Sequence, residues 1–185
     1  MIYIINCGSS KTPLISGIID ELGFASCILP MNNLGNISTA RGFIISGAPV
    51  LLSKTDTETY FKIFEFVKET NVPVMGICFG HQIIGLLYGS EIYLNKAERT
   101  AVEIEILEES ELFKGIARNA LFEEDHTEGI TLPNRFLHLA KSGNYPVEAM
   151  KHASKPIFGV QFHPEASGEN GKKLLRNFCE ICFTK

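Results

Sequence analysis

The segment of this sequence best suited to covalent chemistry is GICFG, residues 76–80, which places a cysteine between two glycines. It follows the apolar run 72–77 and opens a helical pattern that ends near Gly89. Glycines two residues to either side let a strand and a helix pass closely around a strained turn that exposes a nucleophile. The N-terminus of a helix also stabilises a thiolate, the reactive form of cysteine. The pattern predicts Cys78 as a nucleophile, and a buried structural cysteine is the alternative.

A second group of residues, in the segment GVQFHPEAS, could supply the base that a cysteine nucleophile needs. His163 follows the strand-like run 157–162, and Pro164 prevents that strand from continuing. Glu165 lies two residues beyond the histidine and could fix its tautomer and stabilise its charged form. A lone histidine is more often packed or solvent-facing, but one that accompanies a carboxylate and a nucleophile turn favours catalysis.

The elements that must position these residues alternate between strand and helix in the first half of the chain. Short apolar runs predict strands, and apolar residues at helical spacing predict amphipathic helices. In residues 9–23, Thr12 is expected to cap the helix and Gly23 to end it. The expected apolar face of that helix consists of Leu14, Ile15, Ile18, Ile19 and Leu22. The expected strands are 2–6, 25–30, 42–47 and 72–77, and a second helix covers 57–70. This order predicts an α/β fold with a mostly parallel central sheet and helices on both faces.

The second half of the chain is rich in strand patterns and predicts a small antiparallel β extension. The expected strands are 91–94, 101–107, 120–125, 135–142, 147–152 and 157–162. A closing helix over 168–183 contains Cys179 and Cys182, whose spacing favours core packing over redox or metal chemistry. Residues 1–185 show no repeat, low-complexity tract or linker, so we expect a single domain.

Composition excludes several classes of function. The 185 residues carry a formal net charge of −4, which argues against nucleic acid and acidic membranes as partners. Every apolar stretch is shorter than the roughly 20 residues of a membrane span. The first residues lack the basic and small-residue features of a signal peptide. Five cysteines without a disulfide-like spacing indicate a reducing, cytoplasmic setting.

The two motifs together resemble the signatures of the class I, triad-type glutamine amidotransferases, and the resemblance covers nearly the whole chain. It implies a flavodoxin-like α/β fold with Cys78, His163 and Glu165 as the catalytic triad. It also implies hydrolysis of glutamine to glutamate and ammonia through a cysteine thioester, without a cofactor or a metal. Within the family, GICFGHQ, VEAMKHASKPIFGVQFHPE and LLRNFCEIC are most similar to the amidotransferase subunit or domain of GMP synthetases.

The resemblance implies further site residues. The SGGP loop of the family corresponds to residues 46–49, so the backbone N–H groups of Ala48 and Phe79 would form the oxyanion hole. Alanine replaces a glycine at position 48, and the N–H can serve only if its φ is negative. Segment 6–12 also departs from the D-x-G-x-Q pattern of the family. The residues expected at the glutamine are Gly47, Gln82, Asp125, His126 and Thr127.

The resemblance also implies a partner. The sequence contains no SGGxDS-like phosphate loop of a synthetase, so the ammonia acceptor would be a separate chain, of ATP-pyrophosphatase type, that forms GMP from XMP. Its docking surface is expected near residues 48–54, 79–83 and 125–130. Three alternatives stay open: an amidotransferase for another acceptor, a γ-glutamyl peptidase, and an inactive regulatory subunit.

Overall fold

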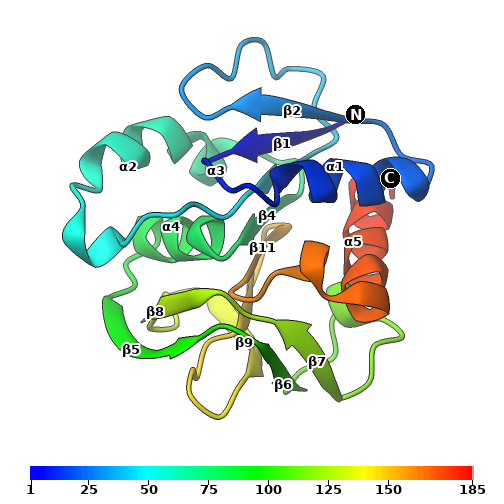
Figure 1. Cartoon of the computed structure of the whole chain (residues 1–185). Helices are drawn as coiled ribbons and strands as arrows, with labels where there is room; N and C mark the ends of the chain where they lie inside the picture. The colour runs from blue at the N-terminus through cyan, green and yellow to red at the C-terminus, as the bar shows by residue number, and fades with distance from the viewer. Residues whose placement is uncertain (185) are drawn as a thin grey trace.

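In the computed structural model, which describes residues 1–184, a nine-stranded sheet runs through the molecule (Figure 1). Its parallel half contains the strands that the apolar runs predict, because strands buried on both faces need continuous apolar sequence. In spatial order these are β2 (Ser26–Pro30), β1 (Ile2–Asn6), β3 (Gly42–Ile45), β4 (Val74–Ile77) and β11 (Ile157–Val160).

The antiparallel strands continue the same sheet beyond β11 rather than forming a separate layer. They are β10 (Ala149–His152), β9 (Phe136–Lys141), β6 (Ala101–Ile106) and β7 (Asn119–Glu123), in that order. The expected α/β fold with an antiparallel extension is confirmed, and the extension is four strands of the main sheet together with a small second sheet.

That second sheet pairs β5 (Ile92–Glu98) with β8 (His126–Ile130) in antiparallel register. The sequence HTEGI does not predict β8, because its buried His126 and Glu128 are polar and mask the apolar alternation of a strand. Burial of such groups requires polar partners inside the protein. This unexpected strand therefore marks a functional or structural polar cluster.

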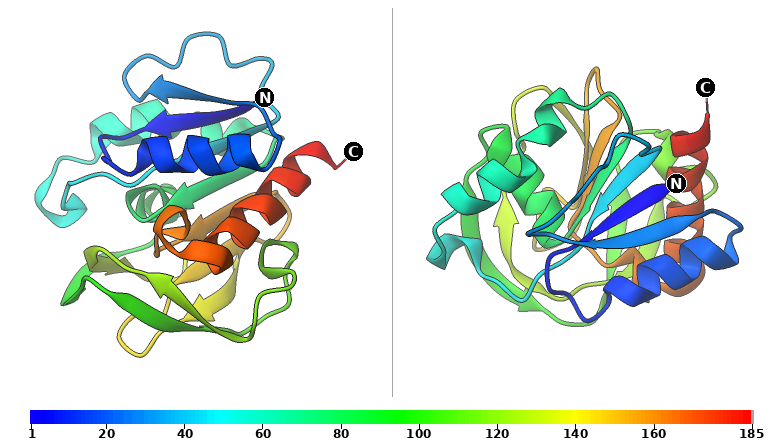
Figure 2. Two further views of the ribbon diagram at one scale, coloured as in Figure 1. Left: turned by 45° about the vertical axis from the view of Figure 1, so that its right-hand side comes forward. Right: turned by 90° about the horizontal axis from the view of Figure 1, so that it is seen from above.

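Helices cover both faces of the sheet (Figure 2). One face holds α1 (Thr12–Glu21) and α5 (Gly168–Phe183), and the other holds α2 (Glu58–Phe64), α3 (Phe66–Glu69) and α4 (Phe79–Leu87). The expected helix over 57–70 is thus two shorter helices, whereas α5 has the predicted bounds. Among residues 1–184 there are also three short 3-10 helices: η1 (Leu52–Lys54), η2 (Glu111–Phe113) and η3 (Pro164–Ala166).

Two separate hydrophobic cores lie on the opposite faces of the sheet. Along β1, Ile2 and Ile4 pack in the core that contains Ile15 of α1, whereas Tyr3 and Ile5 pack in the core beneath α2 and α4. This alternation follows from the two-residue period of a strand. Cys179 and Cys182 lie buried in the apolar face of α5, in agreement with the packing interpretation.

Helix α1 differs from the prediction at its start and on one side. Leu14 is 52% exposed because it lies at the edge of the apolar stripe, which turns to solvent. Thr12 is the first helical residue rather than the cap, and its Oγ1 donates to Oδ1 of Asn6 at 3.2 Å. Gly23 follows the helix at a φ of 85° and ends it as expected.

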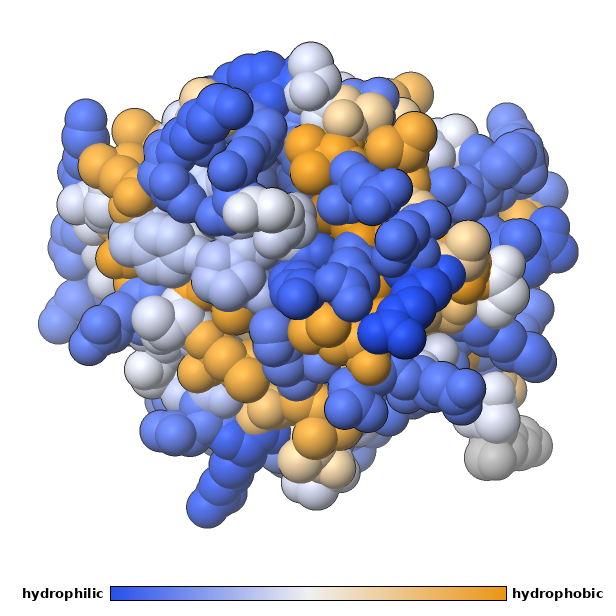
Figure 3. Space-filling view, turned by 90° about the horizontal axis from the view of Figure 1, so that it is seen from below, coloured by the Kyte–Doolittle hydropathy of each residue, from blue (hydrophilic) through white to orange (hydrophobic). Residues whose placement is uncertain are grey.

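The longest helix, α5, has 16 residues. Within residues 1–184, no helix combines the length and the apolar composition needed to cross a membrane. From the side of the antiparallel strands, the surface is mostly hydrophilic with apolar areas between (Figure 3). Exposed apolar side chains on these strands include Leu94, Leu121 and Leu137.

Candidate active site

Cys78 connects β4 to α4 at a sharp turn with φ 50° and ψ −105°, a conformation that L-residues adopt only under strain. The flanking glycines make the turn possible. A Cβ atom on Gly76 would lie 2.3 Å from the carbonyl carbon of Gly80, and one on Gly80 would lie 2.3 Å from the carbonyl oxygen of Ile45. The backbone N–H of Cys78 donates to Val160 of β11 at 2.9 Å, which anchors the turn to the sheet. The predicted strand-to-helix elbow is therefore present.

His163 and Glu165 lie just beyond the end of β11, where Pro164 opens a short 3-10 turn. Nδ1 of His163 is 2.7 Å from Oε1 of Glu165, and both side chains are buried. A carboxylate only accepts, so Nδ1 carries the proton and Nε2 is left for the thiol of Cys78. Burial lowers the pKa of His163, but the hydrogen bonds and negative charges of Cys78 and Glu165 outweigh it and raise that pKa to about 9. The imidazolium form of His163 is therefore favoured through neutral pH.

Gly47 holds the loop after β3 against these two side chains. A Cβ atom at this position would lie 3.2 Å from Cε1 of His163 and 3.8 Å from Cβ of Cys78. The loop over residues 46–49 therefore passes directly over the pair, and glycine provides the space. Ser46, buried beneath it, accepts the N–H of Cys7 at 3.0 Å and fixes the start of the loop.

Ala48 and Phe79, the residues predicted to form the oxyanion hole, both line the cavity that contains Cys78. Within residues 1–184, the non-glycine residues with positive φ are Cys78 and Arg135 alone. The φ of Ala48 is therefore negative, which is the condition for its N–H to serve as a donor. The N–H of Ala48 forms no hydrogen bond with any of the residues that the structure describes. Phe79 is the first residue of α4, where backbone N–H groups have no partner within the helix. Within residues 1–184, both N–H groups thus lack a competing hydrogen-bond partner, as donors of an oxyanion hole require.

A cavity of about 720 Å³ opens above Cys78. Most of the residues predicted to form the site line it, whereas Gly47 and Glu165 support it from behind. The predicted lining residues that contribute are Ala48, Cys78, Phe79, Gln82, Asp125, His126, Thr127 and His163. Lining residues that the sequence does not predict include Gly8, Ser9, Ser10, Lys11, Arg99 and Glu128.

Gln82 is held in one orientation on the floor of the cavity. Its Nε2 donates to the carbonyl oxygen of Glu128 at 3.0 Å and to Oε1 of Gln161 at 3.1 Å. The side chain is 3% exposed, so its position is set before any ligand binds.

The rim of the cavity carries charges of both signs. Asp125 lies 3.0 Å from Nζ of Lys11 and 3.3 Å from Nη1 of Arg99. Partial burial would raise the pKa of Asp125, but these two cations, Lys11 first, hold it below its usual value. Lys11 belongs to the segment that departs from the family pattern, and this departure was the one signal in the sequence that could have identified it.

Glu128 joins the rim to the loop that carries Ala48. Its carboxylate accepts the backbone N–H groups of Leu52 at 2.8 Å and Ser53 at 3.0 Å. A single acid within a strand gives no sequence signal of this role.

Residues 79–83 are buried in α4, so the expectation that they form part of a docking surface is wrong. Only exposed residues around the rim can contribute to such a surface.

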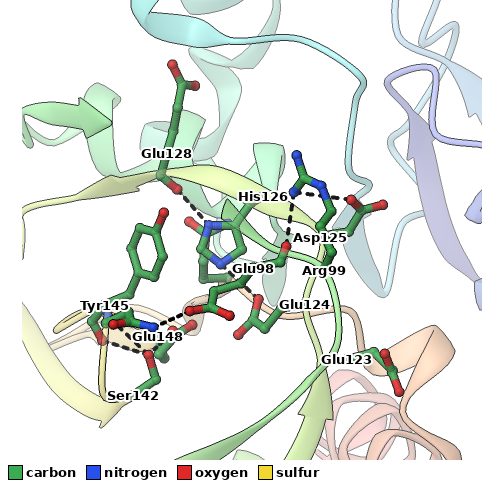
Figure 4. A network of polar contacts seen from close by, with 12 residues as sticks. Glu98, Arg99, Glu123, Glu124, Asp125, His126, Glu128, Ser142, Tyr145 and Glu148 are labelled. Carbon is green, nitrogen blue, oxygen red and sulfur yellow. Dashed lines mark hydrogen bonds and ion pairs between the residues drawn. The ribbon is translucent and has the colours of Figure 1, made fainter. Parts of the chain in front are cut away.

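The ring of His126 lies in a buried polar cluster with Glu124, Glu128 and Glu148 (Figure 4). Its Nδ1 lies 2.9 Å from the carbonyl oxygen of Glu128, and its Nε2 lies 2.9 Å from Oε2 of Glu124. Burial lowers the pKa of His126 and raises that of Glu124 to about 8. Both ring nitrogens of His126 thus contact groups of this cluster, Glu128 and Glu124, and not Cys78.

Comparisons with known proteins agree with this geometry. The family model for class-I glutamine amidotransferases matches residues 3–182. The glutamine-hydrolyzing GMP synthase subunit of Pyrococcus furiosus is 43% identical over 188 residues, covering 98% of each chain. The corresponding subunit of Methanocaldococcus jannaschii is 35% identical over 192 residues and covers 100% of this chain and 99% of its own.

Solved structures share the fold. A structure from Thermoplasma acidophilum, provisionally described as a GMP synthase subunit, has a TM-score of 0.90 and 26% identity and covers 98% of this chain and 92% of its own. A glutamine amidotransferase from Thermotoga maritima, at 16% identity, has a TM-score of 0.82 over 99% of this chain and 98% of its own. The match over almost the whole sequence, the elbow at Cys78 and the His163–Glu165 pair lead to one conclusion: the chain belongs to the class I glutamine amidotransferase family.

Proposed function

We propose that this chain is the glutamine-hydrolysing subunit of a GMP synthase and supplies ammonia to a separate synthetase subunit. The observation that carries the proposal is the placement of Cys78, on a strained elbow, within reach of the buried His163–Glu165 pair at the base of the cavity. The similarity to the glutamine-hydrolyzing subunits of GMP synthases supports the choice of pathway.

In the first half-reaction, the Cys78 thiolate attacks the side-chain amide carbon of glutamine. The N–H groups of Ala48 and Phe79 stabilise the oxyanion of the tetrahedral intermediate. His163 gives its proton to the departing amine, so that ammonia leaves and a γ-glutamyl thioester remains. In the second half-reaction, His163 removes a proton from water, the hydroxide cleaves the thioester, and glutamate and the Cys78 thiolate are released. Glu165 keeps the imidazole oriented throughout.

The rim charges match the amino-acid end of glutamine, which is a zwitterion. Asp125 can accept the α-ammonium group, and Arg99 or Lys11 can bind the α-carboxylate. Gln82 and the backbone of residues 126 and 127 would border the rest of the substrate. Substrate binding would then exchange ion pairs within the protein for ion pairs with glutamine.

A partner is needed because ammonia released into neutral water is mostly protonated and lost as a nucleophile. We infer that an ATP-pyrophosphatase-type synthetase docks over the cavity, on the exposed part of residues 48–54 and on the rim around Asp125. Ordering of this loop by the partner would raise glutamine turnover.

A reducing, cytoplasmic setting fits five cysteines that are all free thiols.

A γ-glutamyl peptidase is the second candidate. A cavity of about 720 Å³ falls in the range that accommodates drug-sized ligands, so γ-glutamyl compounds larger than glutamine fit as well.

The test measures glutamine turnover by the purified chain alone and with a GMP synthase synthetase subunit from the same source, with ATP, magnesium and XMP. We expect stimulation of about ten-fold or more, equivalent to about 1.4 kcal/mol of coupling. Full activity in isolation with a preference for γ-glutamyl peptides would identify the hydrolase instead. Stimulation by a different synthetase alone would move the chain to another pathway, and the absence of activity in every mixture would indicate a regulatory subunit.

A further inference from the structure

A buried group of side chains of the types that can bind a metal ion lies next to the cavity (Figure 4). This group takes no part in the proposed hydrolysis. Glu124 precedes β8, His126 begins it, and Glu148 precedes β10. Their relative exposures are 3%, 5% and 0%, respectively. Each residue offers one ligand atom, and these atoms all lie within 4.8 Å of one another. The chain thus gathers one imidazole and two carboxylates in its interior.

The hydrogen bonding of His126 exposes a lone pair to this group. Nδ1 lies 2.9 Å from the carbonyl oxygen of Glu128, which can only accept, so the proton resides on Nδ1. Nε2 of the neutral ring then directs its lone pair at Oε2 of Glu124, 2.9 Å away. Metal-ligating histidines are typically fixed in this way, by a backbone carbonyl on the nitrogen that does not bind the metal.

The two carboxylates lack the partners that burial demands. Within residues 1–184, Oε1 of Glu124 and Oε2 of Glu148 have no hydrogen-bond partner, and Oε2 of Glu124 faces only Nε2 of His126. Neither carboxylate forms an ion pair with lysine or arginine in these residues. Oε1 of Glu148 accepts a hydrogen bond from the hydroxyl of Ser142 at 2.7 Å. Unpaired buried carboxylates are among the most costly groups in a protein interior, and they are paired with a cation, coordinated to a metal or neutralised by a proton.

We propose that Glu124, His126 and Glu148 bind one divalent transition-metal ion of the zinc type. Two carboxylates balance its charge, and a nitrogen with two oxygens is a donor set that zinc accepts and that magnesium and calcium, which prefer oxygen alone, do not favour. Zinc ligands lie about 2.0–2.2 Å from the ion, so small side-chain rotations suffice to bring these atoms into range. Three protein ligands leave a fourth position for water.

The ion would brace the loop between β7 and β8 without taking part in the reaction. Just before this loop, at the end of β7, the carbonyl oxygen of Glu123 accepts the backbone N–H of His163 at 2.8 Å, and Asp125 within the loop lies on the cavity rim. Glu128, two residues after His126, holds the N–H groups of Leu52 and Ser53. One metal ion would therefore stabilise both the position of the catalytic base and the rim. The proposal does not depend on the ammonia acceptor.

The test uses the full chain with Cys78→Ala, which removes the thiol that could bind zinc in the active site. Equilibrium dialysis against buffered zinc, followed by elemental analysis, is expected to give one zinc ion per chain. Zinc is also expected to raise the midpoint of thermal unfolding, because a ligand that binds only the folded state stabilises it. Magnesium and calcium at the same free concentration are expected to leave the midpoint unchanged.

In the same background, Glu148→Gln should weaken zinc binding by more than about 100-fold, the upper effect of removing an outer-shell partner. Without metal this variant should be at least as stable as its parent, because an isosteric amide replaces a buried carboxylate, so a loss of binding will not reflect unfolding. Glu123→Gln is the matched control: it makes the same change one residue before Glu124, its side chain lies outside the group (Figure 4), and it should bind zinc normally.

A crystal of the zinc-loaded protein should show anomalous density between the three side chains. Zinc bound elsewhere, or equal binding by the Glu148→Gln and parent proteins, would overturn the proposal. So would the absence of stoichiometric zinc, which would mean that protons, and not a metal, neutralise these carboxylates.

Discussion

The imidazole of His163 packs on the backbone of Gly47, where a Cβ atom would lie 3.2 Å from Cε1 of the ring. This distance is shorter than ordinary van der Waals contact, so any side chain at position 47 must displace the base or the loop that carries Ala48.

Gly47→Ala should therefore lower glutamine turnover by up to about 10-fold, which is less than the roughly 100-fold cost of a 1 Å misplacement, because the ring has to yield by only a fraction of that distance. The thermal midpoint should change little, because the loop is at the surface of the cavity. Gly143→Ala is the control: a Cβ there meets nothing within 4 Å, and its kinetics should equal those of the parent. Unchanged turnover in Gly47→Ala would mean that the ring can move without loss.

Replacement of Cys78 should separate activity from stability. Cys78→Ala and Cys78→Gly both remove the thiol and should abolish hydrolysis. In urea denaturation, the free energy of unfolding of the glycine variant should exceed that of the alanine variant by about 1 kcal/mol. The reason is that glycine tolerates a φ of 50°, which strains a residue with a Cβ atom. Equal stability of the two variants would indicate that the elbow stores no strain.

A glutamine-mimicking electrophile should label Cys78 alone among the five cysteines. Burial raises the pKa of Cys7 and of Cys179 to about 12 and raises that of Cys182 further, so these three remain unreactive thiols. Peptide mass mapping identifies the labelled residue, and free glutamine should protect it. Labelling of Cys27, the remaining partly exposed thiol, at the same rate would show that the reagent does not depend on the site.

The pH profile of hydrolysis should report the protonation of His163. Its pKa of about 9 lies above the usual value of about 6.5, so the imidazolium that protonates the leaving amine persists through neutral pH. The rate should fall as the pH rises through about 9. Glu165→Gln removes one of the charges that raise this pKa, so the alkaline limb should move to lower pH while turnover falls. A limb at the same pH in both proteins would contradict the assigned pairing.

Ala48→Gly tests the oxyanion loop. Since the φ of Ala48 lies outside the left-handed region, glycine offers no conformation that the present loop lacks, and turnover should stay within about three-fold of the parent. Loss of a donor from an oxyanion hole costs about 10²–10³ in turnover, so a large gain in Ala48→Gly would show that alanine holds its N–H away from the site.

Sequence alone determined the parts of this protein that depend on neighbouring residues. The elbow at Cys78 follows from two nearby glycines, the His163–Glu165 pair from a separation of two residues around a proline, and α5 from helical periodicity. Local backbone sterics and short side-chain reach suffice to define such features.

Only the tertiary structure decided which remote residues meet. Lys11 reaches Asp125 across 114 positions, and Glu128 binds Leu52 across 76. Glu148, beside β10 of the main sheet, meets His126 of the second sheet. The exposure of Leu14 and the strand β8 also depend on what packs beside them. These contacts depend on the path of the whole chain and on the need to pair buried or opposite charges. Both join residues that are far apart in the sequence, so local sequence patterns do not reveal them.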